Sequence, residues 1–163
     1  MTLKEIKVDL VDYTCNQDTK DMMDLLACYA LDIMGGGDPL SQYTKVNLAS
    51  ELAKLPHAFS FICYVDKKPA GLINCFDAFS TFKCKPIINI HDVIVLPEYR
   101  GLGLSQIMLK KVEEVAEHKG CCKLTLEVLE ANQPAQAAYT KFGFSGYELN
   151  PKIGQALFWE KTL

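Results

Sequence analysis

The spacing of apolar residues along the chain changes period several times, and each period predicts a type of element. Ile6, Val8 and Leu10 alternate with polar residues, as in a strand with one buried face. Apolar residues then recur every three or four positions, which predicts a helix ending at glycines 35–37 and a shorter helix ending before Pro56. The apolar faces of these helices are Met22, Leu25, Leu26, Tyr29 and Ile33 in the first and Val46, Ala49, Leu52 and Ala53 in the second.

After Pro56 the pattern is that of strands. We expect an antiparallel meander over Phe59–Val65, Leu72–Phe82 and Ile87–Leu96. Period 3.6 returns over Leu104–His118, where an apolar face lies opposite a face of lysines and glutamates, and this predicts an amphipathic helix.

The remaining residues alternate between strand and helix patterns. Leu124–Leu129 is predicted as a strand, and a further helix is expected to begin near Asn132 and to end at Gly143. Two closing strands are expected near Phe144–Leu149 and Gln155–Lys161. The order β-α-α-β-β-β-α-β-α-β-β is that of a mixed α/β (α+β) fold, and 163 residues without repeats fit a single domain over the whole chain.

The composition excludes several classes of function. The 17 Lys and Arg residues against 20 Asp and Glu residues give a net charge of -3, so no broad positive field attracts nucleic acid or anionic lipid. No stretch approaches the roughly 20 apolar residues of a membrane span, and the first residues do not resemble a signal peptide. We therefore expect a cytoplasmic protein that binds neither nucleic acid nor membranes.

The seven cysteines are an odd number, which together with the expected cytoplasmic location indicates reduced thiols. The chain has no Cys-x-x-Cys pair and its three histidines form no i,i+4 pair, so we expect no structural metal.

Residues 91–106 carry the clearest chemical signal. An apolar strand leads into a turn with Gly101 and Gly103 and then into the amphipathic helix. Free N–H groups at a helix N-terminus, beside glycines and Arg100, are suited to bind an anion such as a phosphate, although an ordinary glycine turn is an alternative. A dinucleotide fingerprint would need Gly or Ala at Gln106, and the chain has no Walker loop, so a nicotinamide-dependent oxidoreductase is disfavoured.

Two motifs together resemble the Gcn5-related N-acetyltransferase (GNAT) superfamily. They are Arg100-x-x-Gly103-x-Ser105 after an apolar strand and Asn132-x-x-Ala135-x-x-x-Tyr139-x-Lys141-x-Gly143-Phe144. Within the superfamily the segment is most similar to small-amine acetyltransferases of the spermidine/spermine type. The family usually has Gly or Ala where Ser105 stands, a departure that we expect to affect affinity more than function.

The resemblance implies acetyl-CoA as the acetyl donor and a mostly antiparallel sheet whose fourth and fifth strands splay apart to admit it. Backbone groups of Val93, Ile94 and Val95 would pair with the pantetheine arm, and Asn132 would contact the pantetheine or adenosine side. The N–H groups expected to hold the pyrophosphate are those of Arg100, Gly101, Leu102, Gly103, Leu104 and Ser105.

Tyr139 is the predicted general acid, with a core tyrosine as the alternative. Attack of an amine on a thioester expels a thiolate, to which a phenol can donate a proton. The amine must also lose a proton, and Glu127, Asp92 and His91 are all candidates to accept it, directly or through water. A cysteine nucleophile is a weaker idea, because the family reaction resembles direct transfer and no cysteine adjoins a histidine.

The loop of residues 34–43 is expected to form one wall of the acceptor site. Its glycines suit a mobile lid, and Asp32, Asp38 and Tyr43 are candidate amine contacts.

The function implied is direct transfer of an acetyl group from acetyl-CoA to a primary amine of a small molecule in a ternary complex. The alternatives are a protein N-terminal or lysine acetyltransferase and a non-catalytic acyl-CoA-binding module on the same fold. Dimers are common in the family, and the region near Phe158 and Trp159 can pair two subunits.

Overall fold

The computed structural model describes residues 4–147, 152, 154 and 156–163 of the chain. The strands are β1 (Ile6–Leu10), β2 (Ala58–Val65), β3 (Lys68–Ser80), β4 (Lys85–Val95) and β5 (Leu124–Leu126). The helices are α1 (Asn16–Leu31), α2 (Gln42–Leu52), α3 (Leu104–His118) and α4 (Gln133–Phe142), with short 3-10 turns η1 (Ile33–Gly35) and η2 (Pro97–Tyr99). No helix in this described part is long and apolar enough to cross a membrane.

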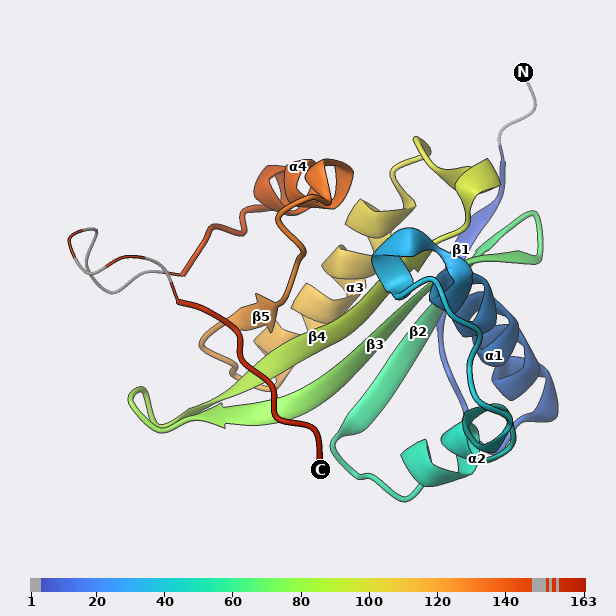
Figure 1. Cartoon of the computed structure of the whole chain (residues 1–163), viewed down its shortest axis with the longest axis horizontal. Coiled ribbons are helices and arrows are strands. Elements are labelled where there is room, and N and C mark those ends of the chain that lie inside the picture. The colour runs from blue at the N-terminus through green and yellow to red at the C-terminus, as the bar shows by residue number, and fades with distance from the viewer. Residues whose placement is uncertain (1–3, 148–151, 153, 155) are drawn as a thin grey trace.

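The five strands form one sheet in the order β1-β2-β3-β4-β5 (Figure 1). The first four strands are antiparallel to their neighbours. β5 is parallel to β4, because the chain returns to the start of the sheet through α3 before it enters β5. The predicted mixed, mostly antiparallel sheet flanked by helices is therefore confirmed.

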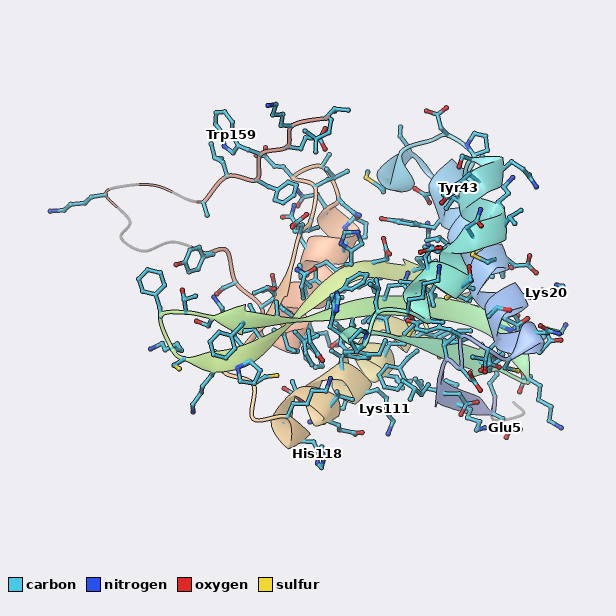
Figure 2. The ribbon with its side chains drawn as sticks, turned by 90° about the horizontal axis from the view of Figure 1, so that it is seen from below. Glu5, Lys20, Tyr43, Lys111, His118 and Trp159 are labelled. Carbon is cyan, nitrogen blue, oxygen red and sulfur yellow. The ribbon has the colours of Figure 1, made fainter. Side chains whose placement is uncertain are left out.

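Each face of the sheet has its own apolar core. Figure 2 shows α3, with Lys111 and His118, on one face and α1 and α2, with Lys20 and Tyr43, on the other. We call these the α3 face and the α1/α2 face. The core of the α3 face includes Ile73, Ile88, Ile90, Met108 and Val112. The core of the α1/α2 face includes Met22, Leu25, Ile62, Leu72 and Ile94.

A bulge in β4 reverses the direction of its side chains. Asn74 pairs with Asp92, whereas the next residue of β3 pairs with Ile90, so His91 is an extra residue in β4. Ile90, before the bulge, belongs to the core of the α3 face, and Ile94, after it, belongs to the core of the α1/α2 face. Asp92 therefore lies on the α1/α2 face.

β4 and β5 separate soon after they begin to pair. Their pairing ends at Ile90 and Leu126, while β4 continues to Val95 with β3 as its partner. The predicted splaying between the fourth and fifth strands is therefore confirmed. Leu96 donates its N–H to a carbonyl of β3 at 2.9 Å. Because backbone groups alternate sides along a strand, those of Val93 and Val95 point toward the open edge.

The C-terminal region differs from the prediction. No strand is assigned to the described residues of the two expected closing strands, 144–147 and 156–161, and their other positions lie outside the described residues. A single backbone hydrogen bond, from Ala156 N–H to Tyr147 O at 3.1 Å, joins the two described segments. β5 also ends at Leu126 rather than at Leu129, and a strand this short offers few backbone groups with which a further strand could pair.

Candidate active site

The turn between β4 and α3 presents free N–H groups. Gly101 and Gly103 have φ angles of 81° and 76°, left-handed conformations that residues with a Cβ adopt only at a cost. Within the described chain, the N–H groups of residues 101–103 make no hydrogen bond to a backbone carbonyl. Those of Leu104 and Ser105 lie in the first turn of α3, where no intrahelical acceptor exists. This turn, with the positive end of the helix dipole, is suited to an anion.

Arg100 is held against the protein rather than extended toward that turn. Its Nη2 donates to Asp32 Oδ2 at 2.9 Å, and its Nε donates to Val95 O at 3.2 Å. Its main-chain N–H donates to Pro97 O at 3.2 Å. Asp32 also accepts the Met34 N–H at 2.9 Å, and this bond, followed by the one from Arg100, lowers the pKa of the Asp32 carboxyl. Arg100 therefore ties the end of β4 to the segment after α1.

A small cavity of about 40 Å³ lies where α1 meets the end of β4. Its lining residues are Cys28, Tyr29, Asp32, Ile94, Val95, Leu96, Pro97 and Arg100. Asp32, one of the three candidate amine contacts, therefore lies at the end of β4. The other two candidates are exposed, Asp38 in the loop and Tyr43 on α2, which is 72% exposed.

Tyr139 packs its ring against the core of the α3 face. Burial raises the pKa of Tyr139 to about 12, with Tyr29 as a second cause, so its hydroxyl is protonated at neutral pH. This hydroxyl makes no hydrogen bond within the described chain, where every fully buried side-chain polar atom has a partner. The hydroxyl is therefore accessible, and it can donate to a group that enters the site.

Polar contacts help to fix α4, which carries Tyr139. Gln106 of α3 donates from Nε2 to Ala138 O at 2.8 Å. Asn132 is the N-cap of α4, and its Oδ1 accepts the Ala135 N–H at 3.3 Å. Asn132 was expected to contact the cofactor, and its observed contact is this helix cap. From the sequence, Gln106 was singled out only as a departure from the dinucleotide fingerprint, so its role in holding α4 was not predicted.

Asp92 is the half-buried candidate among the three possible bases. Its Oδ2 accepts a hydrogen bond from Asn74 Nδ2 at 2.9 Å. His91 is exposed, with its ring edge-on to Phe76 at 5.6 Å between centroids. Glu127 follows the end of β5, is exposed and has no hydrogen bond or ion pair within the described chain. The structure therefore fixes the side chain of Asp92 more firmly than that of Glu127.

Tyr29 lines the small cavity together with Asp32, whereas from the sequence it was predicted only as part of an apolar helix face. Its hydroxyl donates to Met34 O at 3.2 Å. Burial is the main cause that raises the pKa of Tyr29, and the charges of Asp92 and Asp32 raise it further. The sequence signal that could have singled out Tyr29 is its position in the last turn of a helix, shortly before three glycines.

Comparison with known proteins identifies the family of the chain. Residues 20–144 match the acetyltransferase (GNAT) family. The chain belongs to this family. This is the family that the resemblance at residues 87–144 led us to expect.

Several curated members of the GNAT family are related in sequence. The chain is 44% identical over 66 residues to a thialysine N-epsilon-acetyltransferase of Bos taurus. The matched segment covers 40% of this chain and 38% of the relative. It is 30% identical over 103 residues to a putative [ribosomal protein bS18]-alanine N-acetyltransferase of Bacillus subtilis, covering 63% and 64%. These matches span less than two thirds of either relative's length.

Solved GNAT structures confirm the fold over nearly the whole chain. An aminoglycoside acetyltransferase from an uncultured soil metagenomic sample, in complex with sisomicin, has a TM-score of 0.78 at 13% identity, covering 97% of this chain and 96% of that one. An aminoglycoside N-acetyltransferase in complex with CoA has a TM-score of 0.75 at 17% identity, covering 98% and 97%.

Proposed function

We propose that this chain, as one acetyltransferase domain over residues 1–163, transfers an acetyl group from acetyl-CoA to a primary amine of a small molecule by direct transfer in a ternary complex. The observation that carries the proposal is the hydroxyl of Tyr139, which is accessible and has no hydrogen-bond partner within the described chain. Sequence relatives include an enzyme named for thialysine, and structural relatives include enzymes named for aminoglycosides, which are small amines.

The donor fits the groups that the fold leaves free. The backbone groups of Val93 and Val95 point to the open edge of β4 and would pair with the amides of the pantetheine arm, whereas those of Ile94 point to β3. The N–H groups of the glycine turn and the first turn of α3, up to Ser105, would hold the pyrophosphate. Arg100 would have to release Val95 O for the arm to use that carbonyl.

The reaction needs one proton donor and one proton acceptor. The amine nitrogen attacks the acetyl carbonyl, the C–N bond forms and the C–S bond breaks. Asp92 accepts the proton that the ammonium loses before the attack, and Tyr139 donates its proton to the departing thiolate. The second proton that the nitrogen loses as the amide forms restores the Tyr139 hydroxyl. We favour Asp92 over Glu127 and His91, because the hydrogen bond from Asn74 holds its carboxylate in place.

The experiment measures acetyl transfer to a panel of small amines and peptides by mass spectrometry, which avoids thiol-reactive dyes in a chain with seven free cysteines. We expect acetylated small amines with the wild type and a loss of kcat of about 100-fold in Tyr139→Phe, since general acids contribute roughly 10²–10⁴-fold. Tyr147→Phe, at an exposed tyrosine, is the matched control.

Three results would contradict the proposal. An unchanged kcat in Tyr139→Phe would remove Tyr139 from the mechanism. Acetylation of peptide N-termini or lysines alone would indicate a protein acetyltransferase, in line with the relative named for ribosomal protein alanine. Binding of acetyl-CoA without transfer to any acceptor would indicate a non-catalytic module.

The predicted homodimer stays part of the proposal. Leu157, Phe158 and Trp159 are 74–81% exposed, and Figure 2 shows Trp159 on the same side of the sheet as Tyr43. Light scattering after gel filtration is expected to give twice the 18.2 kDa mass of the chain, and a monomer at all concentrations would contradict this. The cytoplasmic location also stays a prediction.

A further inference from the structure

A chain of hydrogen bonds crosses the sheet and ends at Asp92. The Tyr13 hydroxyl lies 2.7 Å from Ser60 Oγ, Ser60 Oγ lies 2.6 Å from Asn74 Oδ1, and Asn74 Nδ2 lies 2.9 Å from Asp92 Oδ2. Ser60, Asn74 and Asp92 occupy paired positions on β2, β3 and β4. They form a straight polar row on the α1/α2 face, next to the apolar row of Ile62, Leu72 and Ile94.

We propose that Tyr13, Ser60 and Asn74 are positioning residues that hold the Asp92 carboxylate in the orientation in which it receives the acceptor amine. This inference rests on the proposed function, because it assigns these residues to the acetyl transfer.

Every donor in the row points toward Asp92. Ser60 gives its single hydroxyl proton to Asn74 Oδ1, so the Tyr13 hydroxyl must be the donor to Ser60 Oγ. The Asn74 oxygen is thereby occupied by Ser60, and its amide NH₂ is the end that faces Asp92. The row thus has one direction, from Tyr13 to the carboxylate.

This direction fixes the amide of Asn74. If the amide were flipped, its oxygen would face the Asp92 carboxylate without a proton between them. That contact would be unfavourable in a site where Ser60 and Asn74 are only 1% and 6% exposed. Asp92 Oδ2 is therefore held by one donor, and Oδ1 is left for a ligand.

The position of the row favours a functional role over a purely structural one. Apart from this row and the contact of Asp21 with Tyr64, the buried residues described on this face are apolar, and buried polar groups contribute little net stability compared with apolar residues of similar volume. The row also ends at the bulge, where Asp92 has just been turned onto this face and where β4 loses β5 as a neighbour. Positioning a carboxylate is a benefit that an apolar row could not supply.

The test is a double-mutant cycle of Asn74→Ala and Asp92→Ala, with kcat and the KM for acetyl-CoA measured for each variant. We expect Asn74→Ala to lower kcat about tenfold, within the range of coupling energies between contacting residues, and to leave the KM for acetyl-CoA unchanged. In the Asp92→Ala background, Asn74→Ala should have no further effect on kcat, because the group that it positions is absent.

Two further variants separate positioning from stability. Tyr13→Phe removes only the first donor of the row and is expected to lower kcat about two- to threefold, and it serves in place of Asn74→Ala if that variant does not fold. Val112→Ala, on the opposite face of the sheet, removes buried methyl groups and should lower the melting temperature without changing kcat.

The outcomes distinguish this proposal from the proposed function. An active wild type whose Asn74→Ala effect is the same with and without Asp92, or absent altogether, overturns the positioning role and leaves the acetyltransferase activity standing. A wild type that binds acetyl-CoA but acetylates nothing overturns the proposed function, and the positioning role falls with it.

Discussion

The glycine turn before α3 offers a perturbation whose cost can be worked out in advance. Gly103 has a φ of 76°, and a Cβ added there would meet no atom within 4 Å. The cost of Gly103→Ala is therefore conformational only, about 1–2 kcal/mol of unfolding free energy. For a domain of this size that lowers the melting temperature by roughly 2–8 °C.

Gly120 is a matched control for this variant. Its φ is 68° and its added Cβ would also meet nothing within 4 Å, but it lies after α3, at the end remote from the turn. Gly120→Ala should thus lose the same stability as Gly103→Ala. We expect only Gly103→Ala to weaken acetyl-CoA binding, by at least about tenfold, because glycines let phosphates approach the main chain closely.

The assay is thermal unfolding of both variants with and without acetyl-CoA. A ligand at 100 times its dissociation constant contributes about 2.7 kcal/mol, and a tenfold loss of affinity would remove about half of that stabilisation. If Gly103→Ala and Gly120→Ala are stabilised equally by acetyl-CoA, the turn does not hold the pyrophosphate and the reasoning is refuted.

Three other predictions concern the same region. Asp32→Asn removes the ion pair that holds Arg100 away from the glycine turn. Because an exposed ion pair contributes about 0.2–1 kcal/mol, release of Arg100 should strengthen acetyl-CoA binding by up to about fivefold in calorimetry, and weaker binding would contradict this. Gly71→Ala would place a Cβ 2.8 Å from Ile94 O and should cost about 1–3 kcal/mol in denaturant unfolding, whereas an unchanged midpoint would contradict the close packing. The pKa of Tyr139 is raised from 10.0 to about 12, so its contribution to stability is complete below pH 10 and is lost as pH rises through 12. Tyr139→Phe should show a smaller loss of stability over this pH window, and an identical loss would show that the shift is absent.

Local signals in the sequence were sufficient for most elements. The helix predicted over Leu104–His118 has these same bounds in the structure, because its period is strong and glycines flank it on both sides. The closing strands were predicted from the local residue pattern alone. A strand exists only where a neighbour supplies backbone partners, and the short β5 supplies few, so the pattern of residues 144–161 could not decide the outcome.

The candidate site was predictable as a set of residue types but not as a set of contacts. The motif pointed to Arg100 but could not show that its guanidinium bonds Asp32, 68 residues earlier in the chain. Asn74 was missed because one polar residue in an apolar strand carries no local signal of its partner. Both contacts depend on pairing between distant segments, which periodicity does not report.

The bulge at His91 decides which face of the sheet Asp92 occupies. If β4 kept His91 but paired without the bulge, Asp92 would be in phase with Ile88 and Ile90, and its carboxylate would turn into the hydrocarbon beneath α3. Substituting His91 would leave the number of residues, and therefore the direction of Asp92, unchanged. The direction of the carboxylate thus depends on the bulge in the backbone and not on the imidazole, so we expect the site to tolerate a change of side chain at His91.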